Sequence, residues 1–124
     1  MTAYALAHLH NPSLHEDVLV YLERIQATMD PFGGRFLAHG PEVEVREGEW
    51  PGTIVLLEFP DADAVRAWYD SPAYQEILPL RTDHITGSAI LFDGVRPGHD
   101  PAKMAAAIRA AQASAGASAA STAS

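Results

Sequence analysis

The chain has 124 residues, enough for one domain with one modest core, and its 48% hydrophobic content is ordinary for a globular protein. Sixteen acidic residues against eight lysines and arginines give a formal charge of −8, so we expect no nucleic-acid partner, because its phosphates would be repelled. The lack of cysteine excludes disulfides and thiol chemistry. No apolar run is long enough to span a bilayer, and the first strand begins too early to leave room for a secretory signal. We therefore expect a cytoplasmic protein with no membrane partner.

The first predicted elements are a strand over Tyr4–His10 and a helix that follows it. Larger and smaller side chains alternate along the strand, and Asn11-Pro12-Ser13 ends it. Ser13 is the predicted helix N-cap, with Glu16 completing a capping box. An apolar stripe then recurs at helical spacing, made of Leu14, Val18, Leu22, Ile25 and Met29.

Two strands and an extended segment are predicted next. Asp30-Pro31 ends the helix, and Phe32-Gly33-Gly34 turns the chain into a short strand over Arg35–His39. The alternating charges of Glu42–Glu47 suggest an extended, solvated edge. After a turn, Thr53–Phe59 is the most apolar strand and is predicted to be central.

The second half of the pattern repeats the first. Asp61 or Asp63 is predicted to cap a helix that buries Val65, Trp68 and Tyr69. Ser71-Pro72 starts a further helical segment that Pro79 ends. Its inward side chains are predicted to be Tyr74, Ile77 and Leu78, and the last strand is predicted over Thr86–Phe92.

This order predicts an α+β fold with ferredoxin-like βαββαβ topology, an antiparallel sheet with helices on one face, over residues 1–96. The other sheet face needs cover because its strands are apolar, so we expect a homodimer that packs sheet against sheet. Residues 97–113 are predicted to form a short helical extension, and the Ala/Ser-rich residues 114–124 a disordered tail.

The chain also resembles the domain-of-unknown-function family thirteen-thirty, of the dimeric α/β-barrel group, over roughly residues 3–95. The blocks that carry the resemblance are Gly33-Gly34-Arg35-Phe36-Leu37, Glu42-Val43, Glu47-Gly48-Glu49-Trp50-Pro51, Leu57-Glu58-Phe59-Pro60, Trp68-Tyr69-Asp70-Ser71-Pro72-Ala73-Tyr74-Gln75 and Pro79-Leu80-Arg81. The resemblance implies a dimer with a pocket between sheet and helices, and no common activity. His8, His10 and the Ala/Ser tail depart from the family pattern.

Related dimeric α/β-barrel groups include cofactor-free quinone-forming monooxygenases, polyketide cyclases, haem-degrading enzymes, dye-decolourising peroxidases and muconolactone isomerase. Because proteins of this fold catalyse such different reactions, the fold alone does not predict the reaction of this chain.

Side chains alternate between the two faces of a strand, and this alternation groups the polar candidates. One face of each strand carries polar residues, and we hypothesise that these faces coincide and line a cavity. The sets are Tyr4, Leu6, His8 and His10; Arg35, Leu37 and His39; Ile54, Leu56 and Glu58; and Thr86, Ser88, Ile90 and Phe92.

The proposed catalytic residues are His8, His10, Glu58, Arg35 and Arg81. Apolar neighbours would raise the pKa of Glu58 toward that of a general base, although pairing with Arg35 or Arg81 is the structural alternative. His8 and His10 would move protons; with His39 or Glu58 they could instead bind a metal, or they could serve only as hydrogen-bonding groups. Arg35 and Arg81 would hold an oxyanion or form ordinary ion pairs.

The predicted substrate-binding residues are His39, Tyr74, Trp50 and Tyr69, with packing as the alternative for the aromatic side chains. No P-loop, nucleophile elbow or dinucleotide fingerprint is present, so we expect no bound cofactor and no metal.

These residues predict a small-molecule-processing protein. The first hypothesis is a cofactor-independent enzyme that performs acid–base chemistry (cyclisation, isomerisation or oxygenation) on an activated carbonyl or polyphenol. The alternatives are a non-catalytic ligand-binding dimer and a dimerisation module with a filled core. A cavity containing a histidine and a carboxylate would favour the enzyme, and an apolar cavity the binding protein.

Overall fold

The computed structural model describes residues 1–123, with side chains described up to residue 116. The elements are, in chain order, β1 (Ala3–His10), α1 (Glu16–Met29), the 3-10 helix η1 (Asp30–Phe32), β2 (Arg35–His39), β3 (Thr53–Phe59), α2 (Ala62–Asp70), α3 (Pro72–Thr82), β4 (Thr86–Asp93) and α4 (Pro101–Ala123). Among the described residues, none of the helices combines the length and apolar character needed to cross a membrane.

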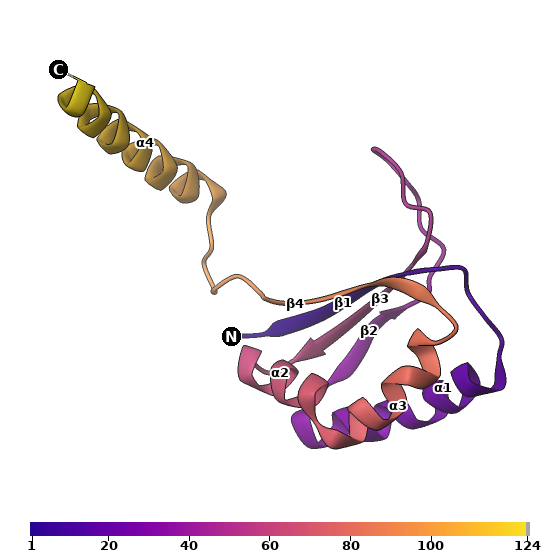
Figure 1. Ribbon diagram of the computed structural model, residues 1–124. Coiled ribbons are helices and arrows are strands. Elements are labelled where there is room, and N and C mark those ends of the chain that lie inside the picture. Colours follow the sequence, from indigo (N-terminus) through magenta and orange to yellow (C-terminus); the bar gives the residue numbers. More distant parts are fainter. Residues whose placement is uncertain (124) are drawn as a thin grey trace.

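The four strands form one antiparallel sheet in the order β2-β3-β1-β4. Helices α1, α2 and α3 lie together on one face of this sheet, and the described part of the chain leaves the other face uncovered (Figure 1). This arrangement confirms the predicted α+β, ferredoxin-like βαββαβ fold. We call the two sides the helix face and the open face.

The hydrophobic core lies between the helix face and the three helices. β1 contributes only small side chains to it, Ala3 and Ala5, whereas β3 contributes Leu57 and Phe59. Small side chains on the central strand leave room for large ones from the helices. The largest of these is Trp68, which is 2% exposed and contacts the rings of Phe59, Tyr69 and Tyr74.

Two predicted helix boundaries are wrong. α1 begins at Glu16 with His15 as its N-cap, because the His15 ring nitrogen accepts a hydrogen bond from the Asp17 N–H. Ser13 instead accepts from the His15 N–H, and Leu14 is exposed. At the other boundary, Pro79 lies inside α3 rather than at its end, since its carbonyl still accepts from the Asp83 N–H.

The β2–β3 pairing contains an irregularity that changes which side chains share a face. Arg35 pairs with Glu58 and Phe36 with Leu57, but the register shifts between Phe36 and Ala38. His39 therefore pairs with Val55 on the helix face, whereas strict alternation would place it beside Arg35. Residues 41–49, which include the predicted extended segment, form an exposed loop that extends away from the sheet (Figure 1).

The C-terminal helix α4 projects away from the α/β unit (Figure 1). It runs to Ala123 and thus continues past residue 113, where we expected a disordered tail to begin. Alanine has the highest intrinsic helix propensity, which favours a helix in this segment without a packed face. The last residue of the expected tail, residue 124, lies outside the described residues.

Candidate functional site

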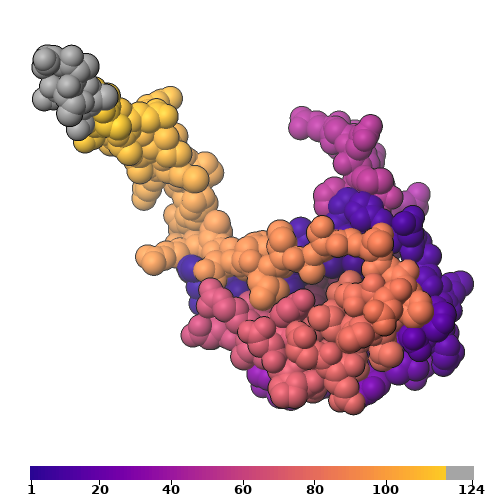
Figure 2. Space-filling view, viewed as in Figure 1, coloured from indigo at the N-terminus to yellow at the C-terminus, as the bar shows by residue number. Residues whose placement is uncertain are grey.

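A cavity of about 280 Å³ lies between the helix face of the sheet and the helices. Figure 2 shows a hollow between β4 and the layer formed by α2 and α3. Most lining side chains are apolar, for example Val18, Leu22, Ile25, Val55 and Leu91. This volume, near the lower end of the range of small-molecule sites, suits a small organic ligand.

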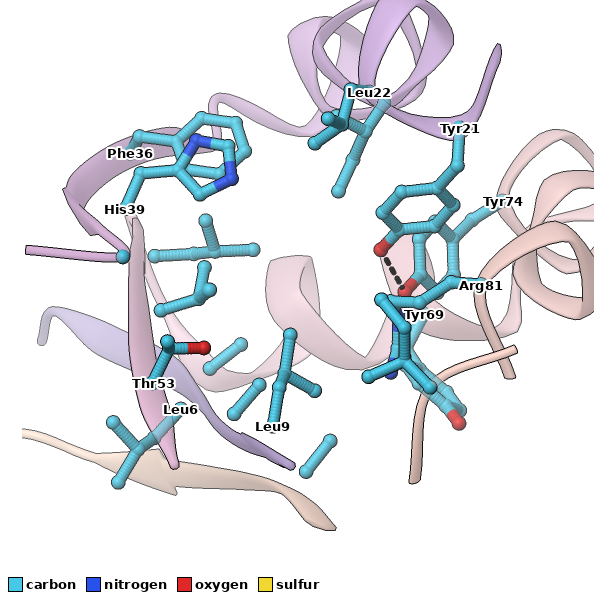
Figure 3. A pocket seen from close by; sticks show the side chains of 18 of the residues that line it. Leu6, Leu9, Tyr21, Leu22, Phe36, His39, Thr53, Tyr69, Tyr74 and Arg81 are labelled. Carbon is cyan, nitrogen blue, oxygen red and sulfur yellow. Dashed lines mark hydrogen bonds between the residues drawn. The ribbon is translucent and has the colours of Figure 1, made fainter. Parts of the chain in front are cut away.

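One end of the cavity carries a cluster of three polar side chains, Tyr21, Tyr74 and Arg81 (Figure 3). α1 supplies Tyr21, and α3 supplies the other two. The two hydroxyl oxygens are 2.8 Å apart and hydrogen-bonded, and the Arg81 guanidinium carbon lies 5.5 Å from the centre of the Tyr21 ring. Among the side chains that the structure describes, no carboxylate lies within ion-pair distance of Arg81.

The charge states of Tyr21 and Arg81 are fixed across the physiological pH range. Burial raises the pKa of Tyr21, and the adjacent Tyr74 raises it further, so this phenol stays neutral. Burial alone would lower the pKa of Arg81, but Tyr21 and Tyr74 outweigh that effect, and the pKa of Arg81 is raised. The cluster thus presents one permanent positive charge and hydroxyl donors to the cavity, an arrangement suited to an anionic or polarised oxygen.

His39 and Phe36 lie on the opposite side of the cavity (Figure 3). Their rings stack with centroids 4.6 Å apart, and His39 remains exposed to solvent. Thr53 adds a hydroxyl to the lining, and Tyr69 of α2 lines it as well. Of the predicted substrate-binding residues, His39, Tyr69 and Tyr74 therefore line the cavity.

The other proposed catalytic residues lie on the open face of the sheet. His8 pairs with Ile54 and Tyr4 with Glu58, so the expectation that His8, His10, Glu58 and Arg35 share a face holds. The hypothesis that this face lines the cavity is wrong, because the small alanines of β1 face the helices. Glu58 accepts from Arg35 at 2.8 and 3.0 Å, in line with the ion-pair alternative.

His8 is held against the turn before β3. Its Nε2 accepts a hydrogen bond from the Gly52 N–H at 3.0 Å, and its ring stacks on Trp50 with centroids 3.9 Å apart. A Cβ on Gly52 would clash with the Leu9 carbonyl oxygen and lie 2.6 Å from the His8 ring, so only glycine fits there. Trp50 therefore packs on His8 rather than lining the cavity. With His39 on the other face, the hypothetical metal set of His8, His10 and His39 is not assembled, and Glu58, the alternative third ligand, is paired with Arg35.

We expect acidification to destabilise the fold through His8. Burial lowers the pKa of His8, and His10 adds to the effect. Protonation also removes the lone pair that binds Gly52. The unfolded chain therefore binds more protons between the ordinary pKa of 6.5 and the lowered pKa of folded His8, and the free energy of unfolding falls as the pH falls from 6.5 through that lowered pKa.

The measurement is the melting temperature between about pH 5 and pH 8 for the wild type, His8→Phe and the exposed control His99→Gln. We expect a shallower acid slope in His8→Phe alone. Parallel curves for all three proteins would contradict this role of His8.

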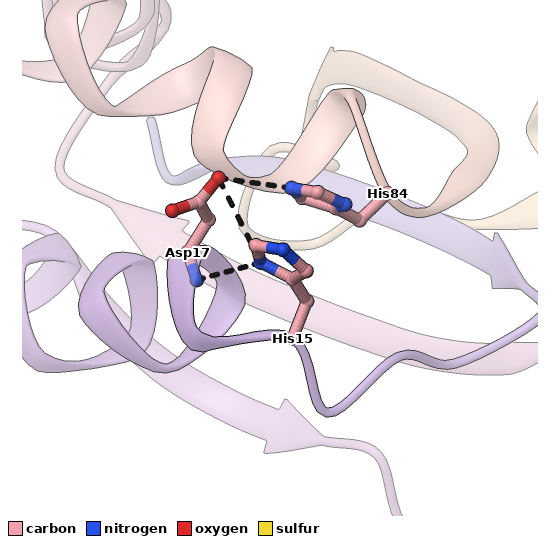
Figure 4. Close-up of side chains that lie close together, drawn as sticks. All are labelled: His15, Asp17 and His84. Carbon is pink, nitrogen blue, oxygen red and sulfur yellow. Dashed lines mark hydrogen bonds and ion pairs between the residues drawn. The ribbon is translucent and has the colours of Figure 1, made fainter.

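Sequence reasoning missed a further cluster, formed by His15, Asp17 and His84 at the junction of α1 and α3 (Figure 4). The His84 Nε2 lies 3.0 Å from the Asp17 carboxylate oxygen, and the His15 and His84 rings stack at 3.8 Å. The only signal in the sequence is the short His-Glu-Asp run at the start of a helix. Its distant partner His84 could not be found from that spacing.

The fold and cavity define a ferredoxin-like α+β protein with a pocket between its sheet and helices. The chain belongs to the family described as Domain of unknown function (DUF1330), whose family model matches residues 2–95. The resemblance seen in the sequence is thus confirmed. No curated protein matches the chain.

Solved structures are similar to this chain in fold. A protein of unknown function from Rhodopseudomonas palustris, RPA0582, matches with a TM-score of 0.60 and 15% identity, covering 77% of this chain and 84% of that chain. A dabb family protein with a ferredoxin-like fold from Mesorhizobium loti matches with a TM-score of 0.51 and 13% identity, covering 77% of this chain and 98% of that chain. Likeness at these identities supports the fold alone.

Proposed function

We propose that this protein binds and processes a small, mainly apolar organic molecule that carries one anionic or polarised oxygen. The observation that supports the proposal is Arg81, a cation that lines an apolar cavity beside two phenol hydroxyls and has no carboxylate partner among the described side chains. An arginine in such a place is available for a ligand oxygen, and the apolar walls suit the rest of the ligand.

The chemistry that fits this site best is acid–base chemistry on an activated carbonyl or a polyphenol, without a bound cofactor. Removal of a proton next to a carbonyl leaves negative charge on the oxygen, and Arg81 with the Tyr21 and Tyr74 hydroxyls would stabilise that charge. His39 is the histidine among the described lining residues, and histidine is the side chain most often used for proton transfer in enzymes, so we assign the proton transfer to it. Cyclisation, isomerisation and oxygenation can all begin from such an enolate or phenolate.

A second candidate is a protein that binds the same class of ligand without turnover. The observation that favours it is the lining itself, which includes one histidine and no carboxylate among the described residues. In this version Arg81 and the tyrosines only hold the ligand. The two candidates share the site and differ in the role of His39.

Deuterium exchange distinguishes the two candidates. The protein is incubated in D₂O with a panel of aromatic 1,3-dicarbonyl compounds, and binding is followed by calorimetry while exchange of the acidic C–H is followed by NMR. An enzyme should accelerate exchange above the buffer rate, and His39→Gln should abolish the acceleration while ligand still binds. Binding without acceleration would identify the non-catalytic protein, and absence of binding across the panel would contradict both.

We propose that the remaining candidates, His8, His10, Glu58 and Arg35, serve the fold and the open face rather than the reaction. Their known partners are one another, Trp50 and Gly52. Substitution of His10 with Ala should therefore leave ligand binding in the cavity unchanged, in contrast to the first hypothesis drawn from the sequence.

We propose further that the protein is a homodimer whose subunits cover each other's open faces. Apolar side chains are exposed on that face: Ile90 is 54% exposed and Phe92 41%. Exposed apolar side chains of this size on an uncovered sheet face favour association.

Sedimentation velocity tests the dimer. We expect Ile90→Lys to shift the protein toward monomer, because it places a charge in the proposed interface. The control Val95→Lys, at an exposed position beyond the end of β4, should leave the dimer intact. A wild type that sediments as a monomer would overturn the proposal.

A further inference from the structure

We infer that His15, Asp17 and His84 form a binding site for a divalent transition-metal ion of the zinc class, a site that the sequence did not suggest. The inference is independent of the proposed function. His15 caps α1, Asp17 lies in its first turn, and His84 follows the end of α3 (Figure 4). An ion held here would link the start of α1 to the end of α3, two helices whose Tyr21 and Arg81 meet in the cavity.

The three ligand atoms are already arranged at nearly the spacing that an ion needs. The Asp17 Oδ2 lies 3.0 Å from the His84 Nε2 and 3.7 Å from the His15 Nδ1, and all three atoms lie within 4.8 Å of one another. Bonds of about 2.1 Å to a tetrahedral ion place two ligand atoms roughly 3.4 Å apart. The observed distances lie on both sides of that value, so the three ligand atoms come together once the rings of His15 and His84 rotate.

The orientation of the rings must change for an ion to bind. The two imidazoles stack with centroids 3.8 Å apart and an interplanar angle of 16°, and a metal lies in the plane of each imidazole that binds it, so one ring must turn out of the stack (Figure 4). The side chains are 49%, 44% and 23% exposed for His15, Asp17 and His84, so an ion can reach them and water can complete its coordination.

The donor set selects the class of ion. Two imidazole nitrogens and one carboxylate oxygen are typical of zinc and related first-row ions, whereas calcium and magnesium prefer oxygen ligands. Two existing interactions oppose binding. The His15 Nδ1 accepts a hydrogen bond from the Asp17 N–H at 3.0 Å, and an ion on that nitrogen would replace this helix cap. The stack of the His15 and His84 rings would also have to open. The adjacent Glu16 and the overall charge of −8 favour a cation here.

The main competing interpretation is a simple ion pair between protonated His84 and Asp17 that joins the two helices without a metal. It predicts that added zinc binds weakly and that substitution of any one of the three side chains does not change the zinc affinity. The two interpretations therefore differ in a direct binding measurement.

The test is calorimetric titration of the full-length, chelator-treated protein with Zn²⁺, with Co²⁺ absorption as a report of coordination. We expect one ion per chain and at least tenfold weaker binding in each of His84→Gln, His15→Gln and Asp17→Asn. The matched control His99→Gln should bind as the wild type does, and Mg²⁺ should not compete. Circular dichroism establishes that each variant is folded.

Three results would overturn the inference: no Zn²⁺ binding by the wild type, unchanged affinity in both histidine variants, or loss of binding in His10→Gln instead. The last result would place the ion on β1. Because these readouts contain no organic ligand, their failure is distinguishable from failure of the proposed function.

Discussion

Replacement of Arg81 with Met should weaken binding of an anionic ligand by roughly ten- to a hundredfold, because a hydrogen bond to a charged group contributes about 1.5–3 kcal/mol. Methionine preserves much of the length and apolar contact of the arginine stem, so the charge is the main change. The measurement is calorimetric titration with an aromatic carboxylate or enolate selected from the panel, at one fixed ionic strength.

Two controls isolate the role of that charge. Arg66→Met removes an exposed arginine of α2 that pairs with Asp63, and should leave the affinity unchanged. A neutral amide analogue of the ligand should bind wild type and Arg81→Met about equally. Equal loss of affinity for the carboxylate and its amide would show that Arg81 acts through packing rather than charge.

Replacement of Trp68 with Ala should cost about 3–5 kcal/mol of unfolding free energy, the range for removal of a large aromatic side chain from a core. Trp68 is 2% exposed, and its indole N–H donates to the buried Thr28 hydroxyl at 3.0 Å. The substitution leaves a cavity in a core that also supports Tyr74, and it removes the donor to the Thr28 hydroxyl, which keeps only its own bond to the Ile25 carbonyl.

Equilibrium unfolding in urea measures this cost. Trp50→Ala serves as the matched control, since Trp50 is only partly buried and lies on the loop before β3, so its loss should cost much less. Equal costs for the two tryptophans would contradict the placement of the core on the helix face alone.

The order of the elements was predictable from the sequence because turn residues and apolar periods agree with each other along the chain. Pro60, Asp61 and the Ser71-Pro72 pair mark element ends by backbone chemistry that does not depend on distant contacts. The start of α1 was not predictable in the same way, because histidine is an uncommon cap and Ser13 offers the better local signal.

The site was harder to predict because the orientation of β1 and the register of β2 depend on tertiary structure. Alternation correctly places His8 and Glu58 on one face, but it does not say which face the helices cover. Helices pack closely on β1 where Ala3 and Ala5 leave space, so the polar residues face away. The register shift in β2 then moves His39 to the cavity, and nothing in the run Arg35–His39 signals it.

Arg81 illustrates a partial success. Its candidacy for an oxyanion role was visible in the sequence, but an arginine in a chain with sixteen acids is expected to have an acidic partner. Only the arrangement of α1 against α3 places phenol hydroxyls beside it instead. The same junction brings His84 to Asp17, 67 residues apart in the chain, which no local pattern could predict.

The most direct test of the central claim is a crystal structure of the protein with a ligand from the dicarbonyl panel. We expect the body of the ligand between the sheet and the helices, with its oxygen within hydrogen-bond distance of Arg81 and a tyrosine hydroxyl. The account would be contradicted by a ligand that binds on the open face, against His8, His10 or Glu58, and not in the cavity beside Arg81.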